Sequence, residues 1–183
     1  MELIIGLAVV ALLVLFVISI YNGLIRLRNI VEEAFSTMDV YMKKRYDLIP
    51  NLVETVKGYA KHESETLEAV IAARNKAQSA TSPEAQIAAE GDLSQVMGRL
   101  FALTESYPDL KANTNFMDLQ KQLQTIETEI AQSRKYYNGS VRTYNTKIEV
   151  FPNNLVAGMF GFTKKPMFEV TNAEERENVK VSF

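Results

Sequence analysis

The sequence predicts an all-α protein in which a single N-terminal transmembrane helix continues into a bundle of long helices. Three observations support this fold class: an almost wholly apolar start, apolar side chains spaced three and four residues apart along the middle, and prolines and glycines after residue 150. We therefore divide the chain into a transmembrane anchor over 1–23, a helical bundle over 24–150 and an irregular tail over 151–183 that ends in a short β element.

Composition excludes several classes of function. The 183 residues include 20 basic and 22 acidic side chains, so the chain lacks the positive excess that binds nucleic acid phosphates. Cysteine is absent, which excludes disulfides, thiolate metal sites and cysteine nucleophiles. The single histidine, His62, lies in a polar turn without a glutamate three positions before it, which excludes a di-iron site of Glu-x-x-His pairs. We predict no catalytic residue, no metal site and no cofactor, and therefore no enzyme.

The anchor is the uncharged segment 3–21, whose 19 residues span roughly the 30 Å hydrocarbon core of a bilayer when helical. An uncleaved anchor is favoured over a cleaved signal peptide, because the start has neither a basic region nor a small-x-small cleavage site. The anchor residues expected to contact lipid include Leu3, Ile4, Leu12, Leu13, Phe16, Ile20 and Tyr21.

Two arginines set the predicted orientation of the anchor. Arg26 and Arg28 follow the apolar segment directly, whereas only Met1 and Glu2 precede it. Basic residues are retained on the cytoplasmic side of a membrane. We therefore expect the short N-terminus outside the cell and the helical bundle in the cytoplasm.

The bundle begins with a helix that is continuous with the anchor. Its apolar stripe includes Leu24, Val31 and Met38, and Pro50 either kinks this helix or lies in the first turn of a new one. The helical spacing extends towards Ala80, although the turn around 61–65 is wholly polar.

Two further helices follow. Ser82 and Pro83 are typical of an N-cap and a first helical residue, and the third helix ends before Tyr107. A fourth helix begins near Asn115 and has the most regular apolar stripe of the chain, from Phe116 to Tyr144. Three to four long helices with short connections predict a bundle.

A row of four polar side chains flanks the stripe of this last helix. Its members, separated by seven, four and seven residues, are Glu127, Arg134, Asn138 and Asn145. Buried polar groups need partners, which Asp39, Lys44, Arg45 or Asp47 could supply. We interpret the row as a structural network that fixes helix register, and an interface with another protomer is the alternative.

The tail contains apolar segments of two kinds. Phe160 and Phe162 belong to the patch LVAGMFGF, which precedes two lysines and either lies at the membrane surface or packs on the flank of the bundle. Val179, Val181 and Phe183 alternate with polar residues as in a strand. Such a strand must pair with residues 168–170, with its own bundle or with a neighbouring chain, and pairing with a neighbour would close a ring-shaped homo-oligomer.

Three runs resemble signature segments of the LemA family of bacterial membrane proteins: YNGLIRLRNIVEEAFSTMDVYMKKRYDLIPNLVETVKGYAKHE, ESYPDLKANTNF and RKYYNGSVRTYNTKIEVFPNN. The resemblance implies a bacterial inner-membrane protein with an antiparallel four-helix bundle after its single membrane helix, and it supplies no catalytic residues. Phe35 stands where the family pattern leads us to expect tryptophan, a change that an apolar site tolerates.

The leading functional hypothesis is a self-assembling scaffold or adaptor that presents a cytoplasmic surface to other membrane proteins, such as quality-control machinery. The alternative is a signalling module in which the helix that continues from the membrane transmits a shift or rotation. A third hypothesis is an enzyme with Glu105, Asp109 or Glu127 as general base, which would require these groups to cluster in a pocket.

Overall fold

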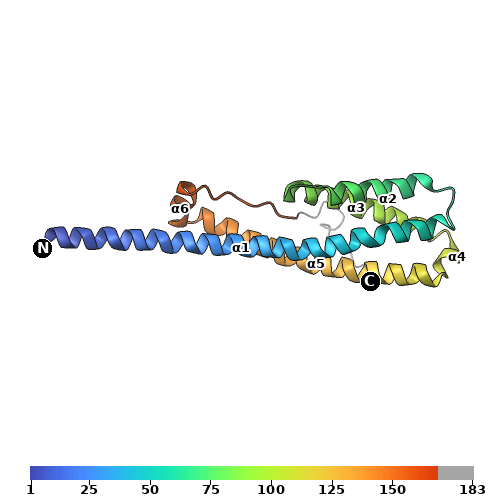
Figure 1. The fold of residues 1–183 in the computed structure, drawn as a ribbon, viewed down its shortest axis with the longest axis horizontal. Coiled ribbons are helices and arrows are strands. Elements are labelled where there is room, and N and C mark those ends of the chain that lie inside the picture. Colours follow the sequence, from blue (N-terminus) through green and yellow to red (C-terminus); the bar gives the residue numbers. More distant parts are fainter. Residues whose placement is uncertain (169–183) are drawn as a thin grey trace, which may run out of the picture. The chain divides into compact units, whose positions relative to one another are not determined.

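The computed structural model describes residues 1–168, and within them the chain is all-helical with no strand. The helices are α1 (Glu2–Lys57), α2 (Ser64–Gln78), α3 (Pro83–Thr104), α4 (Pro108–Lys111), α5 (Thr114–Glu149) and α6 (Asn153–Met159) (Figure 1). The chain divides into two compact units, and α1 and α5 each contribute to both. The first unit consists of Met1–Met38 and Ser133–Met167, and the second consists of Asp39–Gln132 and Phe168.

Helix α1 is a single helix of 56 residues, which confirms that the apolar N-terminal segment continues into the next stripe without a break. Pro50 lies inside this helix and does not begin a new one. The helix ends at Lys57, before Gly58, and the chain becomes helical again at Ser64. The polar turn around 61–65 therefore separates two helices where the spacing alone favoured a continuation, because it offers no apolar side chain to bury.

The first unit pairs the beginning of α1 with the second half of α5. Apolar side chains on both helices recur at spacings of three, four and seven, and this pattern buries one face of each. The buried residues are Leu24, Val31, Ala34 and Met38 on α1 and Tyr137, Val141, Tyr144 and Ile148 on α5. Phe35 contacts the ring of Tyr137 edge to face at 5.6 Å, so the position expected to hold tryptophan is filled by a smaller aromatic ring.

In the second unit, α2 and α3 lie side by side (Figure 1). Helix α3 begins as predicted: Ser82 has an extended backbone, its hydroxyl accepts a hydrogen bond from the amide of Ala85 at 3.2 Å, and Pro83 follows it. Helix α5 begins in the same way, because the side chain of Asn113 accepts a hydrogen bond from the amide of Phe116 at 3.0 Å. Both caps satisfy amides that the first turn of a helix leaves free.

Two short helices were not predicted. Helix α4 lies between the predicted ends of the third and fourth helices, and α6 lies in the tail. The prediction that the tail forms no long helix holds, since α6 has seven residues. At Gly161 the backbone has a φ of 70°, a conformation that glycine adopts without strain, and the chain then continues without helical structure.

Candidate functional site

The second unit contains a group of polar side chains that we call the Arg45 cluster: the buried Arg45, Tyr46 and Glu90 and the half-exposed Glu127. Arg45 on α1 is fully buried and donates hydrogen bonds to Glu90 on α3 and, at 2.7 Å, to Glu127 on α5. The hydroxyl of Tyr46 donates to the other oxygen of Glu90. Such partners compensate for the hydration that a buried charge loses. One guanidinium group thereby links three helices.

The surroundings of the Arg45 cluster keep both Arg45 and Tyr46 protonated. Burial alone lowers the pKa of Arg45, but the charges of Glu90 and Glu127 outweigh it and raise the pKa above its ordinary value. Burial raises the pKa of Tyr46, and the charge and hydrogen bond of Glu90 raise it further. Arg45 therefore stays charged and Tyr46 stays neutral, so this pair positions helices and does not exchange protons near neutral pH.

Further hydrogen bonds extend the Arg45 cluster to α2. The Nε atom of Arg74 donates to the backbone carbonyl of Tyr46 at 3.0 Å. The side-chain amide of Gln86 on α3 donates to Asp39 on α1 at 3.0 Å, and Asp39 also pairs with Lys43 at 2.7 Å. Side chains from α1, α2, α3 and α5 thus meet around residues 39–46 of α1.

Glu90 and Gln86 were not predicted from the sequence to be site residues. Both are buried on α3, where they continue the apolar stripe of Leu93, Met97 and Leu100 backwards at spacings of three and four. A stripe defined only by apolar residues begins at Leu93 and misses them. The sequence did carry a signal: Glu90 occupies a stripe position, and a carboxylate buried there needs a buried partner.

The predicted polar row on α5 is divided between the two units. Glu127 lies in the second unit, and Arg134, Asn138 and Asn145 lie in the first. The side chain of Glu127 is 46% exposed, which is more than its place beside the stripe predicts, because it reaches Arg45 from the edge of the core. Arg134 and Asn138 are partly exposed. That the four residues act as one network stays a prediction.

Asn145 contacts the segment 162–167, which we call the strap. Its side-chain amide donates to the carbonyl of Lys165 and its side-chain oxygen accepts from the amide of the same residue, both at 2.9 Å. The hydroxyl of Tyr144 donates to the carbonyl of Thr163 at 3.1 Å, and that of Tyr137 donates to Pro166 at 2.8 Å. In the first unit the strap therefore lies along α5.

Phe160 and Phe162 pack against the end of the apolar part of α1. Their rings lie 4.8 Å and 5.7 Å from the ring of Tyr21, and Arg28 lies over Phe162 at 5.9 Å from the ring centre. Arg28 also approaches Glu32 at 3.8 Å, while Arg26 is exposed. These contacts join the beginning of the tail to α1 within the first unit.

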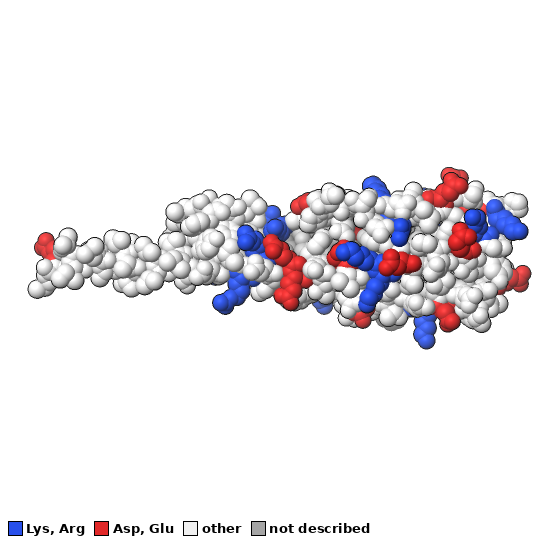
Figure 2. All heavy atoms as spheres, viewed as in Figure 1, with Lys and Arg blue, Asp and Glu red and all other residues white. Residues whose placement is uncertain are grey.

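The predicted anchor residues lie along the N-terminal part of α1, which is exposed up to the contacts of Tyr21 with the tail. Leu3, Ile4, Leu12, Leu13 and Phe16 are exposed, and Ile20 and Tyr21 are partly exposed. Among residues 1–168, α1 is the helix that is long and apolar enough to cross a membrane. Figure 2 shows this end of the first unit as a stretch without charge beyond its acidic tip. The exposed apolar helix fits a membrane protein.

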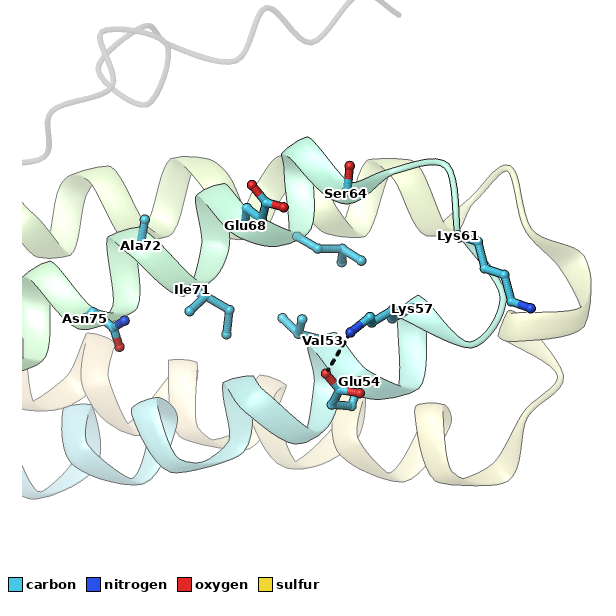
Figure 3. Close-up of a pocket in the computed structure, with 10 residues that line it drawn as sticks. Val53, Glu54, Lys57, Lys61, Ser64, Glu68, Ile71, Ala72 and Asn75 are labelled. Carbon is cyan, nitrogen blue, oxygen red and sulfur yellow. Dashed lines mark ion pairs between the residues drawn. The ribbon is translucent and has the colours of Figure 1, made fainter.

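A groove of about 430 Å³ lies between the end of α1 and α2 in the second unit. Figure 3 shows Val53 and Ile71 pointing toward one another from these two helices, and Leu67 adds to the apolar floor. Charged side chains form the rim, where Lys57 pairs with Glu54 at 3.5 Å. The groove therefore has an apolar floor and a charged edge, the composition of a surface on which an amphipathic helix packs.

Some predicted residues form no part of these sites. His62, Glu105 and Asp109 are exposed, and Glu105 pairs with Lys111 at 2.5 Å. The predicted strand residues Val179, Val181 and Phe183 lie outside the described residues. Within residues 1–168, no three His, Asp or Glu side chains are grouped so that they could hold a metal ion.

The sequence profile of the LemA family matches residues 34–183. The chain belongs to the LemA family. It is similar to Protein LemA of Metamycoplasma hominis, with 27% identity over 157 residues that cover 84% of this chain and 70% of that protein. The family membership predicted from the three signature runs is thereby confirmed.

This LemA family protein is also similar to magnetosome proteins. Magnetosome protein MamQ 2 of Paramagnetospirillum magneticum is 31% identical over 86 residues, which cover 47% of this chain and 32% of that protein. Magnetosome protein MamQ of Magnetospirillum gryphiswaldense is 31% identical over 85 residues, which cover 46% and 31%. The similarity thus spans about a third of the length of each magnetosome protein.

Proposed function

We propose that this protein is a membrane-anchored, self-assembling helical scaffold or adaptor without catalytic activity, which presents a cytoplasmic surface to other membrane proteins. One observation carries the proposal: α1 is a single helix that includes both the exposed apolar segment and Arg45. A continuous helix connects the helical part to the membrane anchor. A surface on that part is then tethered to the membrane that holds its partners.

The helical part of this scaffold is an antiparallel four-helix bundle made of α1, α2, α3 and α5. The Arg45 cluster supports this arrangement, because Arg45 bonds to α3 and α5 and the backbone of Tyr46 accepts a bond from Arg74 on α2. Specific polar pairs of this kind favour one register of packed helices over others.

The cytoplasmic position of the bundle is supported by Arg26 and Arg28, which follow the apolar segment. On that side of a bacterial inner membrane, the groove between α1 and α2 would be open to helices of other membrane proteins. Its apolar floor supplies binding energy, and the charges of Glu54, Lys57 and Lys61 at its edge supply specificity.

Site-specific crosslinking tests the adaptor role at the groove. A photo-crosslinking phenylalanine derivative replaces Ala72, an exposed residue of the groove, or Ala88, an exposed alanine of α3 that serves as the control. In native membranes the full-length protein should crosslink through position 72 to a second copy or to another membrane protein, which mass spectrometry of the product identifies. Equal products from both positions, or products with soluble proteins alone, would contradict the proposal.

Self-assembly is tested by the mass of the full-length protein in several mild detergents. If the end of the tail pairs with a neighbouring protomer, deletion of residues 171–183 lowers the assembled mass and leaves the helical circular-dichroism signal unchanged. A full-length protein that is monomeric in every detergent would refute self-assembly.

The signalling alternative is favoured by the same continuous helix, which could carry a shift or rotation from the membrane to the Arg45 cluster. The two functions differ in what a break in α1 does. Glu33→Gly with Thr37→Gly weakens the helix at two exposed positions and keeps the register of the buried stripe, so it should leave partner crosslinking intact in an adaptor and weaken the output of a relay.

A further inference from the structure

Helix α6 exposes large apolar side chains as well as burying them. Its inner face buries Asn153, Val156 and Ala157 at a spacing of three and four. Its outer face carries Leu155 and Met159, four residues apart and one turn from each other. A helix at the surface of a soluble protein normally turns polar side chains to water.

The outer face is strongly exposed in the structure. Phe151 is 79% exposed, Leu155 58%, Met159 74% and Phe160 53%, and we call these four side chains the α6 patch. Leu155 and Met159, four residues apart, share one side of the helix, and Phe151 lies just before its first turn. Contiguous large apolar side chains mark a surface that is covered in the working protein.

The position of the α6 patch along α1 indicates what covers it. The ring of Phe160 lies 4.8 Å from the ring of Tyr21, and Tyr21 ends the uncharged segment that begins at Leu3. If α1 crosses a bilayer, Tyr21 lies where hydrocarbon meets headgroups, which is the depth that aromatic belts occupy. The contact with Tyr21 places α6 at this same depth, beside the span.

The charged residues near α6 lie outside the apolar segment and not within it. The chain carries no charged side chain from Val150 to Thr163, and the next residues are Lys164 and Lys165. Lys164 pairs with Glu149 at 2.5 Å, and Lys165 is bonded through its backbone to Asn145. Charge therefore flanks the α6 segment and is absent within it, as expected of an element that touches lipid at one level and water at the next.

We infer that α6 is a second membrane contact, whose outer face is buried in the interfacial region of the bilayer next to the span of α1. The bilayer is the occupant that the geometry favours, because the α6 patch continues the apolar surface of the exposed part of α1. This inference rests on the membrane anchor of the proposed function. Two contacts limit the tilt of the first unit relative to the bilayer, which a single helix leaves less defined.

The chain has no cysteine, so a single introduced thiol can be labelled specifically to test this inference. Met159→Cys and Met117→Cys replace two exposed methionines, one in the α6 patch and one at the start of α5. Each full-length variant is labelled with bimane and reconstituted into phosphatidylcholine–phosphatidylglycerol vesicles, with or without brominated acyl chains. Flotation of the vesicles first shows that α1 anchors the protein.

The probe at position 159 should be quenched several-fold more by brominated lipid than the probe at position 117, and several-fold less by aqueous iodide. Iodide quenching at 159 that equals that at 117 would show an outer face in water and overturn the inference. Protection from both quenchers would show a protein cover, such as a second copy, and would overturn it as well. A protein that fails to float refutes the membrane anchor itself, so failure of the proposed function is distinguished from failure of the inference.

Discussion

Asn145 holds Lys165 through two hydrogen bonds, one donated and one accepted by the same side-chain amide, each 2.9 Å long. The amide thus pairs with the backbone of the strap as a neighbouring strand would. Because α6 and the strap are consecutive, this pair also limits where α6 can lie on the first unit. Asn145, predicted to lie in one polar row with Glu127, therefore binds the strap.

Replacing Asn145 with Ala should release the strap without unfolding α5. Loss of two hydrogen bonds costs about 1–3 kcal/mol of local stability, which appears as faster amide hydrogen exchange in residues 163–167. Hydrogen-exchange mass spectrometry of the full-length protein in detergent measures this change. Thr146→Ala alters the neighbouring exposed residue and should leave the exchange unchanged. Equal exchange in the two variants would show that Asn145 does not hold the strap.

Removing Glu90 should destabilise the protein much more than removing Glu127, although both pair with Arg45. Glu90 is buried, so Glu90→Ala leaves a buried guanidinium with one partner, at a cost of about 3–5 kcal/mol. Glu127 is half exposed, and water replaces its carboxylate, so Glu127→Ala should cost about 1 kcal/mol or less. Denaturant unfolding followed by circular dichroism measures both values.

The double variant Arg45→Met with Glu90→Leu provides the control for this comparison. Apolar side chains of similar volume often replace a buried ion pair at little cost, so the double variant should be more stable than Glu90→Ala. A double variant as unstable as Glu90→Ala would indicate that packing, and not an unpaired charge, accounts for the loss.

The raised pKa of Tyr46 predicts a loss of stability at alkaline pH. An unfolded tyrosine loses its proton near pH 10.0, whereas burial and Glu90 keep Tyr46 protonated in the folded protein. Its contribution is fully present below that pH and is lost as pH rises toward the folded pKa. The stability advantage of wild type over Tyr46→Phe should therefore shrink between about pH 9 and about pH 11.

Tyr136→Phe is the matched control for this pH dependence, because Tyr136 is an exposed tyrosine of α5. The change with pH in the unfolding free energy of Tyr136→Phe relative to wild type is the background against which the change for Tyr46→Phe is compared. Parallel curves for wild type and Tyr46→Phe would contradict the assignment of the alkaline loss to Tyr46.

Periodicity predicted the long helices, and local chemistry predicted one of their ends. The spacing from Leu24 to Met38 indicated the continuation of α1, and Ser82 with Pro83 indicated the start of α3. Both signals act within a few residues along the chain, and tertiary contacts did not override them. Helix α6 escaped prediction because seven residues between Pro152 and Gly161 are too few to show a helical period.

The candidate sites were less predictable, because each depends on contacts between distant segments. Glu127 and Asn145 were identified as polar residues beside a buried stripe, but their partners, Arg45 and Lys165, lie 82 and 20 residues away. Spacing along one helix shows which side chains share a face, and it does not show what packs against that face. Glu90 was missed for the related reason that a carboxylate at a stripe position looks like an interruption until its partner is known.

The cytoplasmic orientation of the helical part is the last prediction. Arg26 and Arg28 should keep the chain after the anchor inside the cell, because transferring basic residues that flank a span is unfavourable. His62→Cys introduces one thiol at an exposed residue of the second unit. A membrane-impermeant maleimide should label it only after the cells are permeabilised, whereas Glu2→Cys, at the opposite end of the span, should be labelled in intact cells. Labelling of position 62 in intact cells would reverse the orientation and place the groove and the Arg45 cluster outside the cytoplasm.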